Sequence, residues 1–176
     1  MARGKKPKNR KEVALQDVGK EVALQDVVVI YPSLHEDVVA ALSGEPIYPT
    51  PWFNAPGAEE ANKKYDTNVM GGFSCCNEKC SKKGWGSKRV GIHIQGFSNN
   101  GYNALVFRQR CKACNQLGIL EVDEASYIER VAYRLKKWAG VATTRPAYDP
   151  KGGLPHLRHL CEGCKRGYCT AGSQDY

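Results

Sequence analysis

Eight cysteines in three tight clusters constrain this chain more than any other feature of its sequence. The clusters are Cys75, Cys76 and Cys80, then Cys111 and Cys114, then Cys161, Cys164 and Cys169. The last two each contain a Cys-x-x-C spacing, and such a tight turn directs two thiolates at one tetrahedral zinc ion, at zinc–sulfur distances of ~2.3 Å. A redox Cys-x-x-C is expected once, at a helix start, and disulfide frameworks are typical of small secreted proteins. We therefore expect structural zinc.

The composition is that of a small soluble protein rather than a membrane or secreted one. The 176 residues are 41% hydrophobic and 25% charged, which suits about one domain. The longest aliphatic run, residues 27–30, is far short of the ~20 residues that cross a membrane. No apolar stretch follows the basic N-terminus, as a secretory signal requires. We expect an intracellular protein, cytoplasmic or nuclear, with no membrane span.

The net charge of +8 is unevenly distributed. Residues 1–11 hold six basic residues and no acidic one, which indicates a disordered tail. Residues 12–72 carry −7, residues 73–120 carry +7 and residues 121–176 carry +2. A zinc ion with four thiolates contributes about −2, so the segment around the first two cysteine clusters stays basic after that correction.

The chain divides into three predicted parts. Residues 1–30 comprise the tail and a duplicated eight-residue segment at 11–18 and 20–27, to which we assign no function. Residues 31–64 comprise a short helix at 33–43, with Ser33 as N-cap and Glu36 as its capping-box partner, and a linker with four prolines between 45 and 60. The domain proper is predicted to span residues 65–170.

Within that domain the pattern predicts an α+β fold, a small zinc-ribbon-like antiparallel sheet with one main helix. Apolar residues alternate at 90–95 and 102–109, separated by Asn100-Gly101, a strong hairpin signal. Residues 117–122 offer a third strand. Asp123 then begins a helix whose apolar positions recur at helical spacing, and Gly140 ends it.

Counting ligands narrows the choice of zinc-binding residues but leaves two alternatives open. Two tetrahedral zinc ions need eight ligands. Cys75 and Cys76 are adjacent, so we expect their side chains to point apart and only one of them to bind zinc. The remaining seven cysteines need one histidine, and His156 and His159 both stand shortly before Cys161.

Several landmarks together resemble a known family. They are Tyr65–Phe73, Cys75…Cys80, Gly84-Trp85, Gln109-Arg-Cys111-Lys-Ala-Cys114, Tyr127–Trp138 and Pro155-His156…Cys161-Glu-Gly-Cys164…Cys169. Over residues 65–169 the chain resembles the three-CxxC-type zinc finger, especially its fungal members. The animal receptor-transporting and zygote-arrest proteins share this domain. The resemblance favours Cys75 over Cys76 and His156 over His159. It implies two zinc ions, one held by Cys75, Cys80, Cys111 and Cys114, the other by His156, Cys161, Cys164 and Cys169.

We expect these zinc ions to be structural and the protein not to be an enzyme. Four protein ligands leave no open position for the water that a catalytic zinc activates. The deaminase signature, the phosphate loop and the nucleophile elbow do not occur in the sequence.

The basic segment predicts nucleic-acid binding, with single-stranded RNA favoured. Bases that stack on aromatic rings, with phosphates held by Lys and Arg, are the usual single-strand mode. The candidate residues are Lys82, Lys83, Trp85, Lys88, Arg89, Arg108, Arg110 and Lys112. The resemblance agrees, since zygote-arrest proteins bind messenger RNA through this domain. The competing interpretation is that Trp85 belongs to the core and the basic residues balance thiolates.

The alternative function is that of a protein-interaction or receptor-trafficking adaptor. Receptor-transporting proteins use the domain in this way, and the apolar stripe of the helix at 33–43 could dock a protein partner. Those proteins end in a membrane anchor, whereas this sequence contains no such segment.

Overall fold

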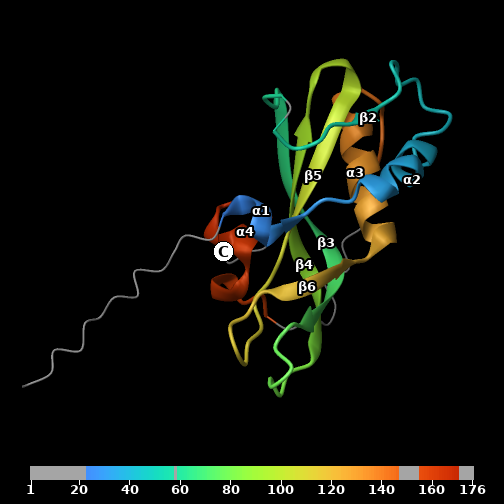
Figure 1. Ribbon diagram of the computed structural model, residues 1–176. Helices are drawn as coiled ribbons and strands as arrows, with labels where there is room; N and C mark the ends of the chain where they lie inside the picture. The colour runs from blue at the N-terminus through green and yellow to red at the C-terminus, as the bar shows by residue number, and fades with distance from the viewer. Residues whose placement is uncertain (1–22, 58, 147–154, 171–176) are drawn as a thin grey trace, which may run out of the picture.

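A long, strongly twisted pair of antiparallel strands forms the centre of the molecule (Figure 1). The computed structural model describes residues 23–57, 59–146 and 155–170. The two strands are β3 (Lys63–Cys75) and β4 (Gly84–Gly96), and β5 (Gly101–Phe107) returns beside β4. The turn into β5 places Asn99 and Asn100 at positive φ, 53° and 59°. The predicted hairpin is therefore confirmed, but its left-handed residues are Asn99 and Asn100, whereas Gly101 is extended at φ −62° and already begins β5.

The six-stranded sheet has the order β1-β5-β4-β3-β6, with β2 paired to β5 off this path. The predicted third strand is observed as β6 (Gly118–Val122), and its partner is β3. The strand β5 pairs with β4 only from Ile92 to Gly96. The first half of β4 is therefore a sheet edge on that side, among the described residues.

The main helix is α3 (Glu124–Trp138), as predicted. The carboxylate of Asp123 accepts a hydrogen bond from the Ser126 N–H at 2.8 Å, which satisfies one free donor of the first turn. Gly140 follows the helix at φ +76°. Tyr127, Val131 and Leu135 are buried against the sheet. The described part of the chain contains no helix of the length and apolarity that a membrane span requires.

The residues that precede Tyr65 also join the sheet and its core. They form α1 (Leu24–Val27), β1 (Val28–Val29), a 3₁₀ turn (Pro32–Leu34), α2 (His35–Ala40) and β2 (Trp52–Phe53). Both short strands pair with β5. The sheet thus includes residues on both sides of the boundary predicted at residue 65. The basic tail and the first copy of the duplicated segment lie outside the described residues.

The start of α2 differs from the prediction. Ser33 lies inside the 3₁₀ turn that Pro32 begins, so its hydroxyl does not stand at the first turn of α2 and makes no cap hydrogen bond. Leu34, Val38 and Leu42 are buried in the core that α2 shares with α3 and the sheet. The apolar stripe proposed for a protein partner is therefore covered by the chain itself.

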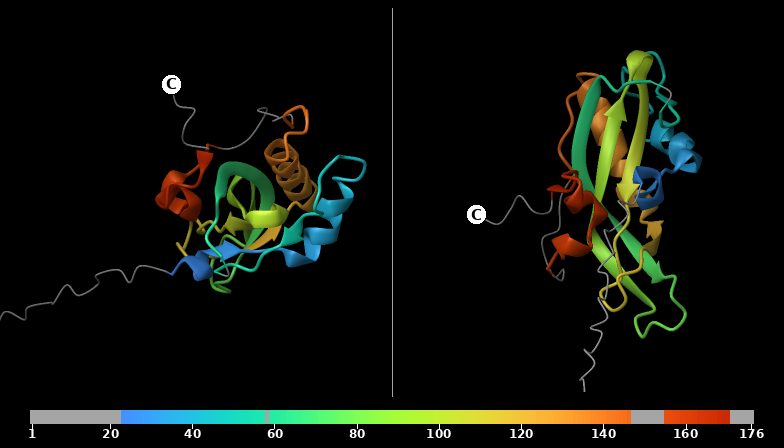
Figure 2. Two further views of the ribbon diagram at one scale, coloured as in Figure 1. Left: turned by 90° about the horizontal axis from the view of Figure 1, so that it is seen from above. Right: turned by 60° about the vertical axis from the view of Figure 1, so that its left-hand side comes forward.

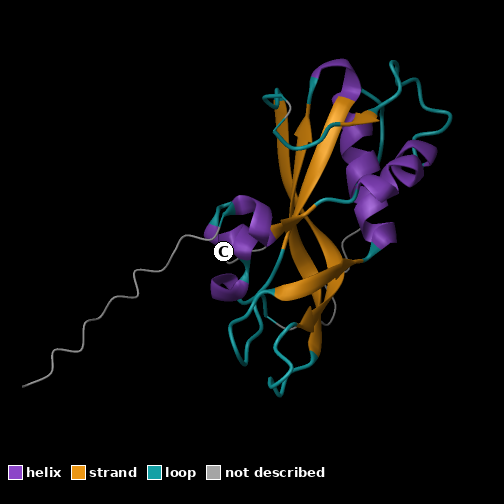
Figure 3. Cartoon of the chain, viewed as in Figure 1, coloured by secondary structure: helices purple, strands orange, loops and turns teal. Residues whose placement is uncertain are grey.

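The third cysteine segment (residues 155–170) packs on the face of the sheet opposite to α3. There α4 (Glu162–Lys165) contacts β4 (Figure 2). The Tyr168 ring stacks on Phe107, with centroids 5.3 Å apart, and lies 4.5 Å from the ring of His93. Figure 3 shows this small helical segment apart from α2 and α3. The sheet is thus covered on both faces, which explains why every residue of β5 is buried.

Candidate metal centres and the adjoining cleft

The first cysteine quartet gathers at one end of the sheet. Cys75 ends β3, Cys80 follows in the next turn, and Cys111 and Cys114 lie in the loop between β5 and β6. Their four Sγ atoms lie within 4.8 Å of one another. The Cys75–Cys114 and Cys80–Cys111 sulfur pairs are 3.5 and 3.7 Å apart.

Two short turns carry these cysteines, the first knuckle (residues 75–83) and the second knuckle (residues 111–116). Backbone hydrogen bonds hold both turns in shape. The Cys75 N–H donates to the Lys83 carbonyl at 2.8 Å, and the Cys111 N–H donates to the Gln116 carbonyl at 2.8 Å. Asn115 closes the second knuckle at φ 60°, a left-handed conformation that asparagine tolerates. The sequence therefore places four thiols around one point by means of two short turns.

The second quartet combines His156 with Cys161, Cys164 and Cys169, again within 4.8 Å. The His156 Nε2 lies 3.2 Å from the Cys164 Sγ and 3.7 Å from the Cys169 Sγ. Cys161 precedes α4, and its Sγ accepts a hydrogen bond from the Cys164 N–H at 3.4 Å. This is the geometry in which a Cys-x-x-C turn presents both sulfurs to one ion.

Both quartets fit zinc. Around a tetrahedral zinc ion, ligand bonds of ~2.3 Å to sulfur and ~2.0 Å to nitrogen separate two sulfurs by roughly 3.8 Å, and a sulfur from a nitrogen by roughly 3.6 Å. The distances above match these values and greatly exceed a disulfide bond of ~2.05 Å. None of the eight cysteines forms a disulfide bond. The two candidates that the sequence left open lie outside: Cys76 is exposed, with its Sγ 3.3 Å from the Leu117 carbonyl, and His159 is exposed.

One thiol in each quartet is predisposed to ionise. Burial raises the pKa of Cys111, but the N–H groups of Ala113 and Cys114 and the neighbouring thiols outweigh this effect and lower it to about 7. Hydrogen bonding from Cys169 is the main cause that lowers the pKa of Cys161 to about 4. In the same clusters the pKa values of Cys75 and Cys164 are raised. A divalent cation is the partner that lets all the thiolates of such a cluster coexist.

Sequence comparison agrees with this geometry. A family model of the three-CxxC zinc ribbon, described as a zinc-binding domain, matches residues 68–167. The chain belongs to this family. No curated protein and no solved structure matches it significantly. As a three-CxxC zinc ribbon, the chain carries two zinc sites, as predicted.

The buried carboxylate of Glu162 joins the second knuckle of this zinc ribbon to the third cysteine segment. Glu162 follows Cys161, and its side chain is 2% exposed. It accepts hydrogen bonds from Arg110 at 2.5 Å, Lys165 at 2.9 Å and Arg166 at 2.6 Å. Burial alone would raise the pKa of Glu162, but these three cations lower it to about 2. Because Arg110 precedes Cys111, the ion pair ties the second knuckle to the third cysteine segment.

Backbone contacts reinforce this connection. The Arg110 N–H donates to the Leu160 carbonyl at 2.7 Å, and the Glu162 N–H donates to the Arg108 carbonyl at 3.1 Å. Sequence reasoning missed Glu162, although a single acid between two cysteines and among basic residues was a usable signal.

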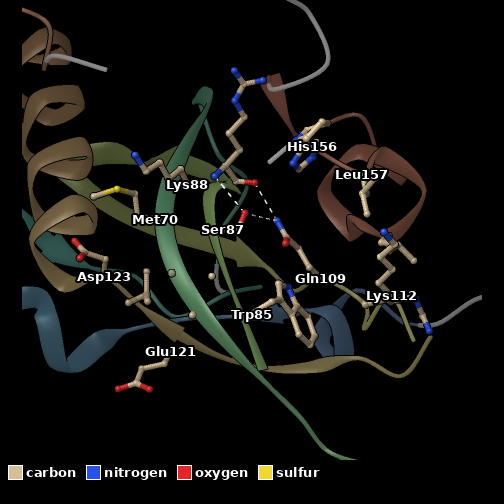
Figure 4. A pocket seen from close by; sticks show the side chains of 18 of the residues that line it. Met70, Trp85, Ser87, Lys88, Gln109, Lys112, Glu121, Asp123, His156 and Leu157 are labelled. Atoms are coloured by element: carbon tan, nitrogen blue, oxygen red, sulfur yellow. Dashed lines mark hydrogen bonds between the residues drawn. The ribbon is translucent and has the colours of Figure 1, made fainter. Parts of the chain in front are cut away.

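A cleft of about 890 Å³ opens between β4, the second knuckle and the third cysteine segment (Figure 4). His156 and Leu157 form part of its wall, so the second metal site also shapes the cleft. Six of the eight residues predicted to contact nucleic acid line it: Lys82, Trp85, Lys88, Arg89, Arg110 and Lys112. Two acidic residues, Glu121 and Asp123, also line it.

The remaining two predicted residues do not line the cleft. Arg108 donates to the carbonyls of Gly118 and Asp26, at 2.8 and 3.0 Å, and so holds β6 and α1 to the end of β5. The Lys83 ammonium donates to the Glu78 carbonyl at 2.9 Å, inside the first knuckle.

Trp85 has a structural role as well as a place in the cleft wall. Its ring stacks on Phe73 with centroids 5.1 Å apart, and a Cβ at Gly118 would come within 2.6 Å of it. Glycine at position 118 therefore makes room for the indole. Since the side chain is only partly buried, it also presents surface to the cleft.

Proposed function

We propose that this protein is a non-catalytic zinc ribbon that binds single-stranded nucleic acid, RNA above all, in the cleft beside β4. The observation that supports this function most is that six of the eight predicted residues line one cleft. These residues come from two stretches of the sequence, 82–89 and 110–112. A basic cleft with an aromatic side chain is the arrangement by which single strands are bound without sequence selectivity.

Three lysines place positive charge on the exposed surface of the cleft. Arg110 is committed to the buried Glu162, so it contributes mainly to the shape of the wall. Lys82, Lys88 and Lys112 are exposed along the cleft. With two zinc ions and seven thiolates, the formal net charge falls from +8 to about +5, which still favours a polyanion.

A catalytic role has no comparable support. Each quartet supplies four ligands, which completes tetrahedral coordination and leaves no position for an activated water. The ions would then contribute to folding, since metal binding supplies much of the folding free energy of small metal domains.

The test is RNA binding by the zinc-loaded protein, measured by fluorescence anisotropy with a fluorescein-labelled 12-nucleotide oligouridine. Lys82→Glu combined with Lys112→Glu should weaken binding at least tenfold. It should also reduce the magnitude of the slope of log affinity against log salt by about 1.4, because two phosphate contacts are lost.

The matched control is Lys64→Glu combined with Lys137→Glu. It makes the same change in net charge at two exposed lysines outside the cleft, so only long-range attraction is altered. Equal losses in the two double variants would contradict a cleft-specific site. Failure of the wild-type protein to bind RNA, together with a protein partner retained after nuclease treatment, would favour the adaptor function instead.

A further inference from the structure

Two polar side chains in the cleft wall, those of Ser87 and Gln109, are oriented by a hydrogen bond to each other. Gln109 Nε2 donates to Ser87 Oγ at 3.1 Å and to the Arg89 carbonyl at 3.0 Å. A carbonyl oxygen only accepts, so the nitrogen end of the carboxamide must point toward β4. The Gln109 Oε1 therefore points away from that strand, with no ambiguity between its two amide orientations.

This arrangement leaves one acceptor and one donor unused. Gln109 is only 8% exposed, and no hydrogen bond within the described chain uses its Oε1. Ser87 Oγ accepts from the Arg89 N–H at 3.2 Å and from Gln109, which occupies both lone pairs and leaves its own O–H to donate. Both side chains line the cleft, as Figure 4 shows. The Gln109 Oε1 is not among the buried side-chain atoms that lack a partner, so it is accessible to water or to a ligand that donates a hydrogen bond.

We infer that Ser87 and Gln109 bind the Watson–Crick edge of an unpaired nucleobase held in the cleft. This inference rests on the proposed function and names what the cleft recognises. Every nucleobase presents an acceptor next to an N–H donor on that edge; in uracil, O4 accepts from the Ser87 hydroxyl and N3–H donates to Gln109 Oε1. Pairing in a duplex occupies this edge, so the site selects single strands.

The decisive experiment compares two oligonucleotides that differ only at that edge. The zinc-loaded full chain is titrated into labelled 12-nucleotide oligouridine and into the same oligomer built from N3-methyluridine, which lacks the N3–H donor. We expect wild-type protein to bind the methylated oligomer about tenfold more weakly. Gln109→Met should bind both oligomers equally, because the acceptor is gone.

Cobalt absorption, with two equivalents bound, verifies that each variant is folded.

The outcomes separate this inference from the proposed function. Equal wild-type affinity for the two oligomers, with binding still lost in the Lys82→Glu and Lys112→Glu double variant, would overturn base recognition and leave RNA binding intact. No wild-type binding to either oligomer would overturn both.

Discussion

Substitution of Glu162 is the sharpest test of how the second knuckle is held to the third cysteine segment. In Glu162→Gln the side chain keeps its shape but loses its charge, and three cations lose their common partner. The folded chain lowers the pKa of Glu162 from its ordinary value of 4.5 to about 2. At 1.36 kcal/mol per pH unit, this difference corresponds to about 3 kcal/mol of stability. Removal of one partner from a buried ion pair costs a similar amount, roughly 3–5 kcal/mol.

The pH of the measurement follows from the direction of this shift. Because the pKa is depressed in the folded state, the contribution is complete above pH 4.5 and declines as the pH falls from there toward 2. Measurement at pH 7 therefore records all of it. The assay is urea unfolding followed by tryptophan fluorescence at one fixed free zinc concentration, since zinc itself stabilises the folded state.

Glu45→Gln is the matched control for this variant. Glu45 pairs with Lys136 at 2.8 Å, but their side chains are 29% and 20% exposed. Water screens such a pair, so the loss should stay below about 1 kcal/mol. If Glu162→Gln proves no more destabilising than Glu45→Gln, the buried ion pair does not hold the second knuckle to the third cysteine segment.

Three further predictions concern the metal sites and the main helix. Cys75→Ser should weaken metal binding at the first site enough that native mass spectrometry detects one zinc per chain under limiting zinc, whereas Cys76→Ser should retain two; the reverse result would exchange the ligands. Asp123→Ala removes the hydrogen bond to the Ser126 N–H and should lower the free energy of unfolding by about 1 kcal/mol, measured by urea denaturation. Leu135→Ala should lower it by about 2–5 kcal/mol in the same assay, because its side chain is 5% exposed within the core; a cost below 1 kcal/mol would mean that α3 is not docked as described.

The features predicted correctly from the sequence are those encoded locally. Cysteine spacing encodes the knuckles, the turn residues 98–100 encode the hairpin, and the cap at Asp123 with the periodic apolar residues encodes α3. Each depends on residues close together in the chain. The two quartets also came together as predicted, although their assembly joins Cys75 to Cys114 and His156 to Cys169.

The sequence did not reveal where α2 begins, nor two contacts between residues that are distant in the chain. Ser33 follows every rule for an N-cap, yet Pro32 begins a 3₁₀ turn one step earlier and moves the helix start to His35. The Ser87–Gln109 pair joins β4 to the segment that follows β5, at a level where β4 and β5 are not paired. The role of Glu162 depends on Arg110, 52 residues away. A local pattern can single out Glu162, but it does not identify a partner that is distant in the sequence.

The most direct test of the account is a metal count joined to a folding measurement. Native mass spectrometry of the purified chain should show two zinc ions per molecule, and removal of both with a strong chelator should abolish the near-ultraviolet circular dichroism of the packed aromatic rings. Readdition of zinc should restore it. A chain that keeps this signal and its cooperative unfolding with neither ion bound would contradict the claim that metal coordination maintains the fold.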